Sequence, residues 1–340
     1  MTRSRLALIV FLILAPIHAQ TTPNDDRFNA AAAYSAGTNG DALLVYIDGE
    51  LVFEEYQNGY DGTTPHALFS GTKSFSCAIA LIAQRDGLLT LDETLADTLT
   101  EWQGDAQKSQ VTLRQLLSLT SGVRGDETVL RRARVDTYAL AVEAPSEAAP
   151  GERFRYGNTQ YGIFGAFMMR KFAAAGLEVD PATYLAAQVT DALDMPSLSW
   201  TRDSAGNPLL ASGAQATARD WAQFGLLILA GGMWEGEQLL PAETLPECFM
   251  GSAANPNYGL TFWLGYETQD LATIVRQTLM SPEPATSAPT ETPAFWIAAG
   301  ANNQRLYIIP AHNMVVVRFG RRDRRFRDGA LMTELLAGVE

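Results

Sequence analysis

Two pairs of strand-like runs stand at opposite ends of this chain. The first, DALLVYIDGELVFEEY at residues 41–56, contains Asp48-Gly49, a dipeptide that strongly favours a tight β-hairpin. The second, QRLYIIPAHNMVVVRFG at residues 304–320, is another pair of strand runs around a short turn. YGLTFWLG at residues 258–265 adds a further candidate strand. Any fold for this chain must therefore bring strands from its two ends into sheet structure.

The sequence between these strands is mostly helical in pattern. TLRQLLSLTSG at residues 112–122 and TARDWAQFGLLILAGG at residues 217–232 carry apolar residues at helical spacing and end at glycine. The order predicts an α+β fold of the α/β sandwich type: one antiparallel sheet built from both termini, flanked by helices, with a mainly helical subdomain inserted. We expect an α/β subdomain at about residues 28–66 plus 251–340 and a helical subdomain at about residues 67–250.

Size and charge limit the class of function. A chain of 340 residues that is 47% hydrophobic can bury a large core. The net charge of −13 argues against nucleic acid as a partner, because phosphate binding needs a clustered positive surface. One basic cluster exists, RRDRRFR at residues 321–327, but it contains an aspartate and leads into a predicted C-terminal helix. We interpret it as a solvated face.

The first residues have the pattern of an export signal. Two arginines precede the apolar stretch 6–17, and a small-residue cleavage site ends at Ala19. The stretch is too short to span a bilayer comfortably, and no later segment approaches the roughly 20 apolar residues that a span requires. We predict a signal peptide at residues 1–19 and a single mature domain at residues 20–340, periplasmic or secreted and without a stable membrane span. An uncleaved N-terminal anchor is the alternative.

Few side chains here are typical metal ligands. The cysteines are Cys77 and Cys248, and His18 belongs to the predicted signal. Metal sites of the usual His/Cys type are thereby nearly excluded, and we expect no cofactor. Cys77 is expected to pack as a small buried hydrophobe, although export would allow it to pair with Cys248. His66 and His312 lie in loop and turn patterns and are expected at the surface.

The stretch LFSGTKSF places Ser70 three residues before Lys73, at the start of an apolar helical run that ends at Asp86-Gly87. Residues three apart on a helix share a face, and a helix N-terminus favours developing negative charge. The pair could therefore be a nucleophile and its base. A lysine has an unperturbed pKa of about 10.4, so burial would have to lower that pKa. The alternative is a serine N-cap followed by a helix-favouring lysine.

A second element, PGERFRYGNTQYGIFG, contains Tyr156 and Asn158 after a Pro-Gly turn. A tyrosine hydroxyl near a lysine can pass protons, and an asparagine amide can hold both the lysine and a substrate carbonyl. Aromatic-glycine-asparagine is also common in loops, so this element gains weight only beside the first.

These phrases resemble a known family. LFSGTKSF, GLLTLDETLADTL, TLRQLLSLTSGV, PGERFRYGNTQYGIFG and GAQATARDWAQFGLLILAGGMWEGEQLL follow the order seen in the class C β-lactamase-like serine hydrolases. The resemblance covers essentially the mature chain. EEYQNGYDGTTPHALFSGTKSF is most similar to the 6-aminohexanoate-dimer hydrolase branch of amidases and esterases. The resemblance implies a serine β-lactamase/transpeptidase-like fold with its active site where the two subdomains meet.

The same resemblance assigns roles to residues. It implies that Ser70 is acylated by substrate, that Lys73 and Tyr156 share the work of the general base, and that Asn158 positions the lysine. The expected partner is a small ester or amide substrate.

The sequence departs from the family at its third motif. The family usually has a Lys- or His-Thr-Gly triplet on the edge strand, and the corresponding position here is Ala298-Ala299-Gly300. Gly300 still permits close substrate approach, and the Ala301 and Ser70 N–H groups could form an oxyanion hole. The missing cation or hydroxyl would have held a substrate carboxylate. The departure therefore favours a different ester or amide over β-lactams and D-Ala-D-Ala peptides.

Three hypotheses follow. The first is an exported serine hydrolase that acts on small esters or amides. The second is a β-lactamase or penicillin-binding D,D-peptidase that uses another cation, such as Arg305. The third is a non-catalytic binding or sensor protein on the same fold. The Pro/Ser/Thr-rich stretch from Thr268 to Pro293 is either a lid or a disordered insertion, and the oligomeric state is not readable from the sequence.

Overall fold

The computed structural model describes residues 26–127, 134–265 and 293–338. The predicted signal peptide lies outside the described residues, as does all but the last residue of the predicted lid or insertion.

Six strands of the described chain form one antiparallel sheet in the order β2-β1-β11-β10-β9-β8. The strands are β1 (Gly40–Ile47), β2 (Glu50–Tyr56), β8 (Trp263–Gly265), β9 (Phe295–Gly300), β10 (Gln304–Ile309) and β11 (Met314–Gly320). The N-terminal hairpin pairs directly with the C-terminal one, because β1 lies between β2 and β11. The predicted sheet from both termini is confirmed.

The tight turn between β1 and β2 follows from its sequence. Asp48 has φ 52° and Gly49 has φ 83°, so both central residues are left-handed, as a type I′ hairpin turn requires. Aspartate and glycine tolerate this conformation better than other residues do. The local sequence therefore sets the register of the first hairpin.

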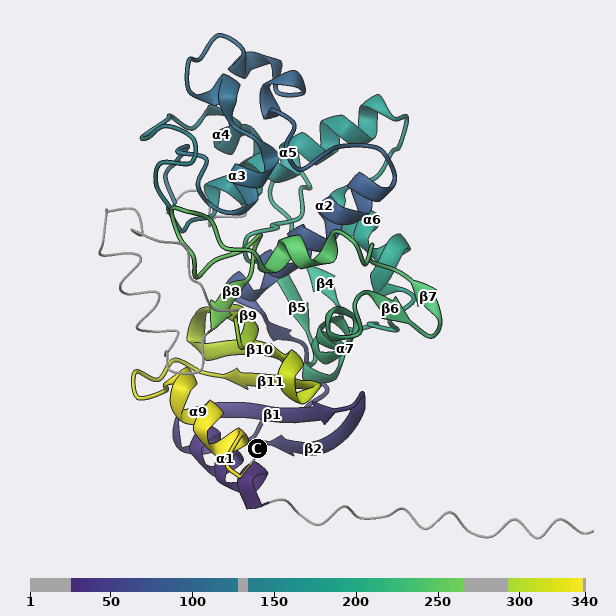
Figure 1. The fold of residues 1–340 in the computed structure, drawn as a ribbon, viewed down its shortest axis with the longest axis vertical. Helices are drawn as coiled ribbons and strands as arrows, with labels where there is room; N and C mark the ends of the chain where they lie inside the picture. Colours follow the sequence, from purple (N-terminus) through teal and green to yellow (C-terminus); the bar gives the residue numbers. More distant parts are fainter. Residues whose placement is uncertain (1–25, 128–133, 266–292, 339–340) are drawn as a thin grey trace, which may run out of the picture.

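Helices cover both faces of this sheet. α1 (Asp26–Gly37) and α9 (Asp328–Leu335) pack together, and α1 packs against β1, while α7 (Ala218–Leu229) packs on β10 and β11 (Figure 1). Alternation along β10 separates the faces: Arg305 and Tyr307 bond Asp328 of α9, whereas Leu306 lies against Gly225 of α7. The result is the predicted sandwich of a sheet between helical layers.

The other α-helices of the described ranges lie between β2 and α7 in the chain. They are α2 (Phe75–Arg85), α3 (Leu113–Leu117), α4 (Thr137–Glu143), α5 (Thr159–Ala174) and α6 (Pro181–Leu185). Short strands accompany them: β3 (His66–Ala67), β4 (Ser199–Trp200) and β5 (Ala214–Ala216) form a small sheet, and β6 (Met233–Trp234) pairs with β7 (Glu237–Gln238). Figure 1 shows α3, α4 and α5 at the end of the molecule opposite α1 and α9.

Two predicted elements are shorter than their patterns suggested. The helix expected to run to Gly122 ends at Leu117, because Leu119 adopts a left-handed φ of 61° and turns the chain away. The strand expected from Tyr258 begins only at Trp263, and Thr261 just before it has φ 76°. In both cases the apolar residues of the sequence pattern extend beyond the regular element, because the backbone turns at a left-handed residue.

A disulfide joins Cys77 of α2 to Cys248 of a 3₁₀ segment, Leu245–Phe249. Both cysteines are buried, so the expectation that Cys77 packs in the core holds, and the pairing that the sequence left open is formed. The bond ties the helix that follows Lys73 to the segment that leads toward β8.

We predict that this crosslink stabilises the fold substantially. Replacing Cys77 and Cys248 together with alanine should lower the free energy of unfolding by about 2–4 kcal/mol, because the bond spans 171 residues and restricts the unfolded chain. Urea denaturation followed by circular dichroism measures the difference, and wild type unfolded with a reductant is the control. Two titratable thiols in the denatured, unreduced protein would contradict the pairing.

Candidate active site

Ser70 and Lys73 lie on one 3₁₀ turn, Phe69–Ser74, that leads into α2. The sequence predicted that Ser70 would begin an α-helix, and this is corrected. In a 3₁₀ helix, side chains three residues apart lie directly above one another. Ser70 and Lys73 are therefore better aligned than they would be on an α-helix. Lys73 Nζ lies 3.3 Å from Ser70 Oγ.

Ser70 does not act as a helix cap. The N-cap positions of the 3₁₀ turn and of α2 are occupied by Leu68 and Ser74. Phe69, directly before Ser70, has φ 48°, a left-handed conformation that is costly for an aromatic residue. This sharp turn presents the serine at the end of β3.

The amino group of Lys73 is buried among oxygen acceptors from three segments. The residue is 1% exposed. Besides Ser70 Oγ, its Nζ donates to Asn158 Oδ1 at 3.0 Å and to the Ala211 carbonyl at 2.7 Å. The sequence analysis required Lys73 to be buried if it is to act as a base, and the residue is buried. The Ala211 contact had no sequence signal, because any residue supplies a backbone carbonyl.

Aromatic rings surround the same amine. Lys73 Nζ lies 5.2 Å from the ring centre of Tyr156 and 5.0 Å from that of Tyr161. Burial raises the pKa of Tyr161 and of Tyr258 well above the usual range, and their hydroxyls are 2.9 Å apart. Both therefore remain neutral phenols that pack behind the lysine.

Tyr156 and Asn158 meet Lys73 from the start of α5. The Tyr156 ring lies 5.4 Å from Trp263 of β8 and 6.1 Å from Tyr258, which hold it beside the amine. Asn158 is 7% exposed and precedes α5 directly. The structure thus brings together the two motifs that the sequence predicted to cooperate.

Gly300 ends β9 beside the turn that carries Ser70. A β-carbon at position 300 would overlap the Leu68 carbonyl oxygen, so only glycine fits this approach. Ala301 follows at an exposed position. The described chain therefore places the Gly300-Ala301 backbone near the serine turn.

The alanines before Gly300 bring no polar group. Ala298 is buried and pairs with Leu306, while Ala299 is half-buried and pairs with Arg305. Arg305 is itself engaged, because its guanidinium bonds Asp328 and donates to the Gly300 carbonyl at 3.1 Å. This guanidinium supports the strand from the face opposite α7.

The histidines are only partly at the surface. His66 stacks on Phe319 with ring centres 4.7 Å apart, and its Nε2 lies 3.4 Å from Asp41 Oδ2, so the expectation of a surface loop residue is corrected. It stacks because β3 pairs with β5 and carries the ring inward. His312 lies half-buried in a turn. In the described ranges, no group of three or more His, Cys, Asp or Glu side chains could hold a metal ion.

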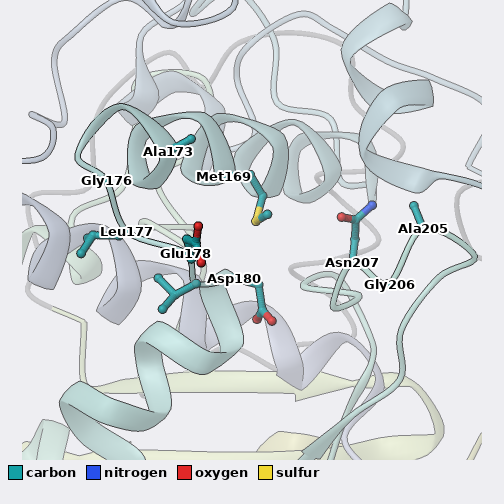
Figure 2. Close-up of a pocket in the computed structure, with 10 residues that line it drawn as sticks. Met169, Ala173, Gly176, Leu177, Glu178, Asp180, Ala205, Gly206 and Asn207 are labelled. Carbon is teal, nitrogen blue, oxygen red and sulfur yellow. The ribbon is translucent and has the colours of Figure 1, made fainter.

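A separate cavity of about 560 Å³ lies at the far end of α5 (Figure 2). Met169 of α5, Asp180 and Asn207 are among the residues that line it, and none of the predicted site residues does.

Within the parts of the chain that the structure describes, no helix is long and apolar enough to cross a bilayer.

Comparisons with known proteins agree with the fold. The family model for Beta-lactamase matches residues 25–339. Protein flp of Staphylococcus aureus is 27% identical over 111 residues, a stretch that is 30% of this chain and 22% of that protein. The chain therefore aligns with less than a quarter of the length of these curated relatives.

Solved structures resemble the whole described fold. A 6-aminohexanoate-dimer hydrolase homologue from Bacillus anthracis is 22% identical with a TM-score of 0.67, covering 85% of this chain and 75% of its own. A D-alanine carboxypeptidase from Burkholderia cenocepacia is 19% identical with a TM-score of 0.65, covering 89% and 96%. A class C beta-lactamase from Rhodobacter sphaeroides is 17% identical with a TM-score of 0.67, covering 91% and 98%. At these identities the likeness establishes the fold.

The close approach at Gly300 yields a testable expectation. Gly300→Ala should lower the free energy of unfolding by about 1–3 kcal/mol, because the Leu68 carbonyl it meets is backbone and cannot turn aside. Gly37→Ala is the matched control, since a β-carbon there meets nothing within 4 Å. Thermal denaturation of the two variants checks this. Equal stability would show that the β9 backbone does not press against the serine turn.

Proposed function

The chain belongs to the beta-lactamase family, and we propose that it is an exported serine hydrolase that cleaves a small ester or amide through an acyl-enzyme on Ser70. Members of this family are serine hydrolases. The observation that carries the proposal is the buried Lys73 amine, 3.3 Å from the Ser70 hydroxyl.

Hydrogen bonding supports Lys73 as the base. Its contacts to Asn158 Oδ1 and the Ala211 carbonyl can only be donations, since both oxygens lack a proton. In a neutral amine these use both N–H bonds and leave the lone pair for a hydroxyl proton such as that of Ser70. Attack of Ser70 Oγ on the substrate carbonyl carbon would then transfer this proton to Nζ.

Proton return would complete acylation. As the tetrahedral intermediate collapses, the bond to the leaving oxygen or nitrogen breaks, and that atom takes a proton from Lys73 or through the Tyr156 hydroxyl. In deacylation a water loses its proton to the same pair and attacks the acyl carbon, and Ser70 regains its proton. The net reaction is hydrolysis to a carboxylic acid and an alcohol or amine.

Backbone donors would stabilise the oxyanion. The Ser70 N–H and the Ala301 N–H are the donors we assign, because β9 runs against the serine turn at Gly300. One such donor is typically worth about 2.7–4 kcal/mol of transition-state stabilisation. These donors need no side chain at positions 298 and 299.

The choice of substrate rests on those alanines. Without a lysine, histidine or threonine in the triplet, the strand offers no side-chain cation or hydroxyl for a carboxylate. Arg305, the alternative cation, is engaged by Asp328 and by backbone. We therefore place neutral esters or amides ahead of β-lactams and D,D-peptides. Export accords with the N-terminal pattern and with a disulfide, which persists in oxidising compartments.

The nucleophile can be tested directly. A fluorophosphonate probe should add once to wild type and not at all to Ser70→Ala, as measured by intact mass. Lys73→Ala and Tyr156→Phe should each lower kcat for a chromogenic ester by at least about 100-fold, the scale of a lost general base. Burst kinetics also separates this enzyme from a non-catalytic binding protein. Labelling that persists in Ser70→Ala refutes the assignment.

Substrate preference is tested with a matched pair of esters. p-Nitrophenyl acetate should have a kcat/KM about 10- to 150-fold above that of mono-p-nitrophenyl succinate and of a cephalosporin, on the scale of one charge-assisted hydrogen bond that the site does not supply. Steady-state rates give the ratio. A preference for the cephalosporin would instead favour the β-lactamase hypothesis.

A further inference from the structure

Asn158 occupies a helix N-cap without capping the helix. Asparagine at this position ordinarily accepts a hydrogen bond from the second or third N–H of the helix and has an extended backbone. Asn158 makes no side-chain cap bond, and its φ of −105° and ψ of −18° are helical. Its Oδ1 instead accepts from Lys73 Nζ at 3.0 Å. The N–H groups of Asn158 and Thr159, where α5 begins, also need acceptors.

Glu127 supplies that acceptor from 31 residues away in the chain. Its Oε2 accepts from the Asn158 N–H at 2.5 Å. Its Oε1 accepts from the Thr159 N–H at 3.2 Å and from the Thr159 hydroxyl at 2.7 Å. A carboxylate also interacts favourably with the positive end of a helix as long as α5, which has 16 residues.

Gly157 makes room for this carboxylate. A β-carbon at position 157 would overlap Glu127 Oε1 and lie 2.8 Å from Glu127 Cδ. Gly157 does not have a left-handed φ, so another residue could adopt its backbone conformation. Glycine at this position thus leaves the room that Glu127 occupies, and a larger residue would displace the carboxylate.

We propose that Glu127 is a positioning residue for the reaction. By accepting from the backbone N–H groups of Asn158 and Thr159, it fixes the backbone from which the Asn158 amide reaches Lys73. The inference rests on the proposed function, because the lysine held in this way is the proposed base. Nothing in the local sequence around Glu127 indicates this role, since its partners are distant in the chain.

The main test is Glu127→Ala. It should lower kcat for p-nitrophenyl acetate by about 10- to 150-fold, as expected for one displaced charge-assisted hydrogen bond, with little change in KM. In the combined variant with Asn158→Ala the loss should not exceed that of Asn158→Ala alone, because both act through one amide. Glu127→Gln, which keeps one acceptor, should restore part of the rate.

A matched control separates positioning from stability. Asp136 is also a carboxylate at a helix start, where it accepts from the N–H groups of Tyr138 and Ala139 in α4. Asp136→Ala should lower the melting temperature as Glu127→Ala does but leave kcat unchanged.

Gly157→Ala probes the same contact without removing the carboxylate. It should reproduce the loss in kcat when Glu127 is present and add nothing in the Glu127→Ala background, where the β-carbon has room. This variant also serves if Glu127→Ala does not fold.

The outcomes are distinguishable from those of the proposed function. Wild-type kcat in folded Glu127→Ala, or additive losses with Asn158→Ala, overturns the inference while the hydrolase assignment stands. If wild type is not labelled by a fluorophosphonate, the proposed function fails. The crystal structure of Glu127→Ala then still decides: Asn158 Oδ1 shifted away from Lys73 supports the inference, and Oδ1 kept on Lys73 overturns it.

Discussion

The burial of one amino group is the constraint around which this site is organised. A buried amine without hydrogen-bond partners would be costly, and Lys73 meets its need with oxygens from Ser70, Asn158 and Ala211. These belong to a 3₁₀ turn, the start of α5 and the loop before β5. The chain can satisfy the lysine only by bringing the three segments together, so the contacts on which the proposed chemistry depends also hold this part of the fold.

The sheet also supports the site, through contacts on the face that α1 and α9 cover. Arg305 and Tyr307 both bond Asp328, which anchors α9 to β10. The same arginine donates to the carbonyl of Gly300, and Gly300 lies against the Leu68 carbonyl just before the serine. A polar network on the α1/α9 face is therefore connected through one strand to the proposed oxyanion donors. Because both ends of the chain build this sheet, the site depends on residues that are far apart in sequence.

Local patterns carried much of the prediction. The first hairpin followed from Asp48-Gly49, because the turn residues themselves choose the left-handed backbone. Ser70 and Lys73 followed from spacing within one turn. The contacts that sequence reasoning missed are made by distant partners, the Ala211 carbonyl and the carboxylate of Glu127, and the one it left open joins Cys77 to a cysteine 171 residues away. A backbone carbonyl has no sequence signature, and a lone glutamate resembles any other surface acid.

The altered third motif shows how such a site could change its substrate without losing its chemistry. The proposed oxyanion donors are backbone N–H groups, so they survive any side chain at positions 298 and 299 that leaves Gly300 in place. Ala298 faces the α7 side with Leu306, where it is buried, and a lysine there would carry its charge into packed surroundings. The alanines thus fit a strand whose backbone would carry a proposed oxyanion donor and whose side chains fill space. In the proposed mechanism the triplet offers no grip for a carboxylate, so selection among neutral esters and amides would have to come from groups outside it, because the serine, the buried lysine and the strand backbone do not contact the rest of the acyl group.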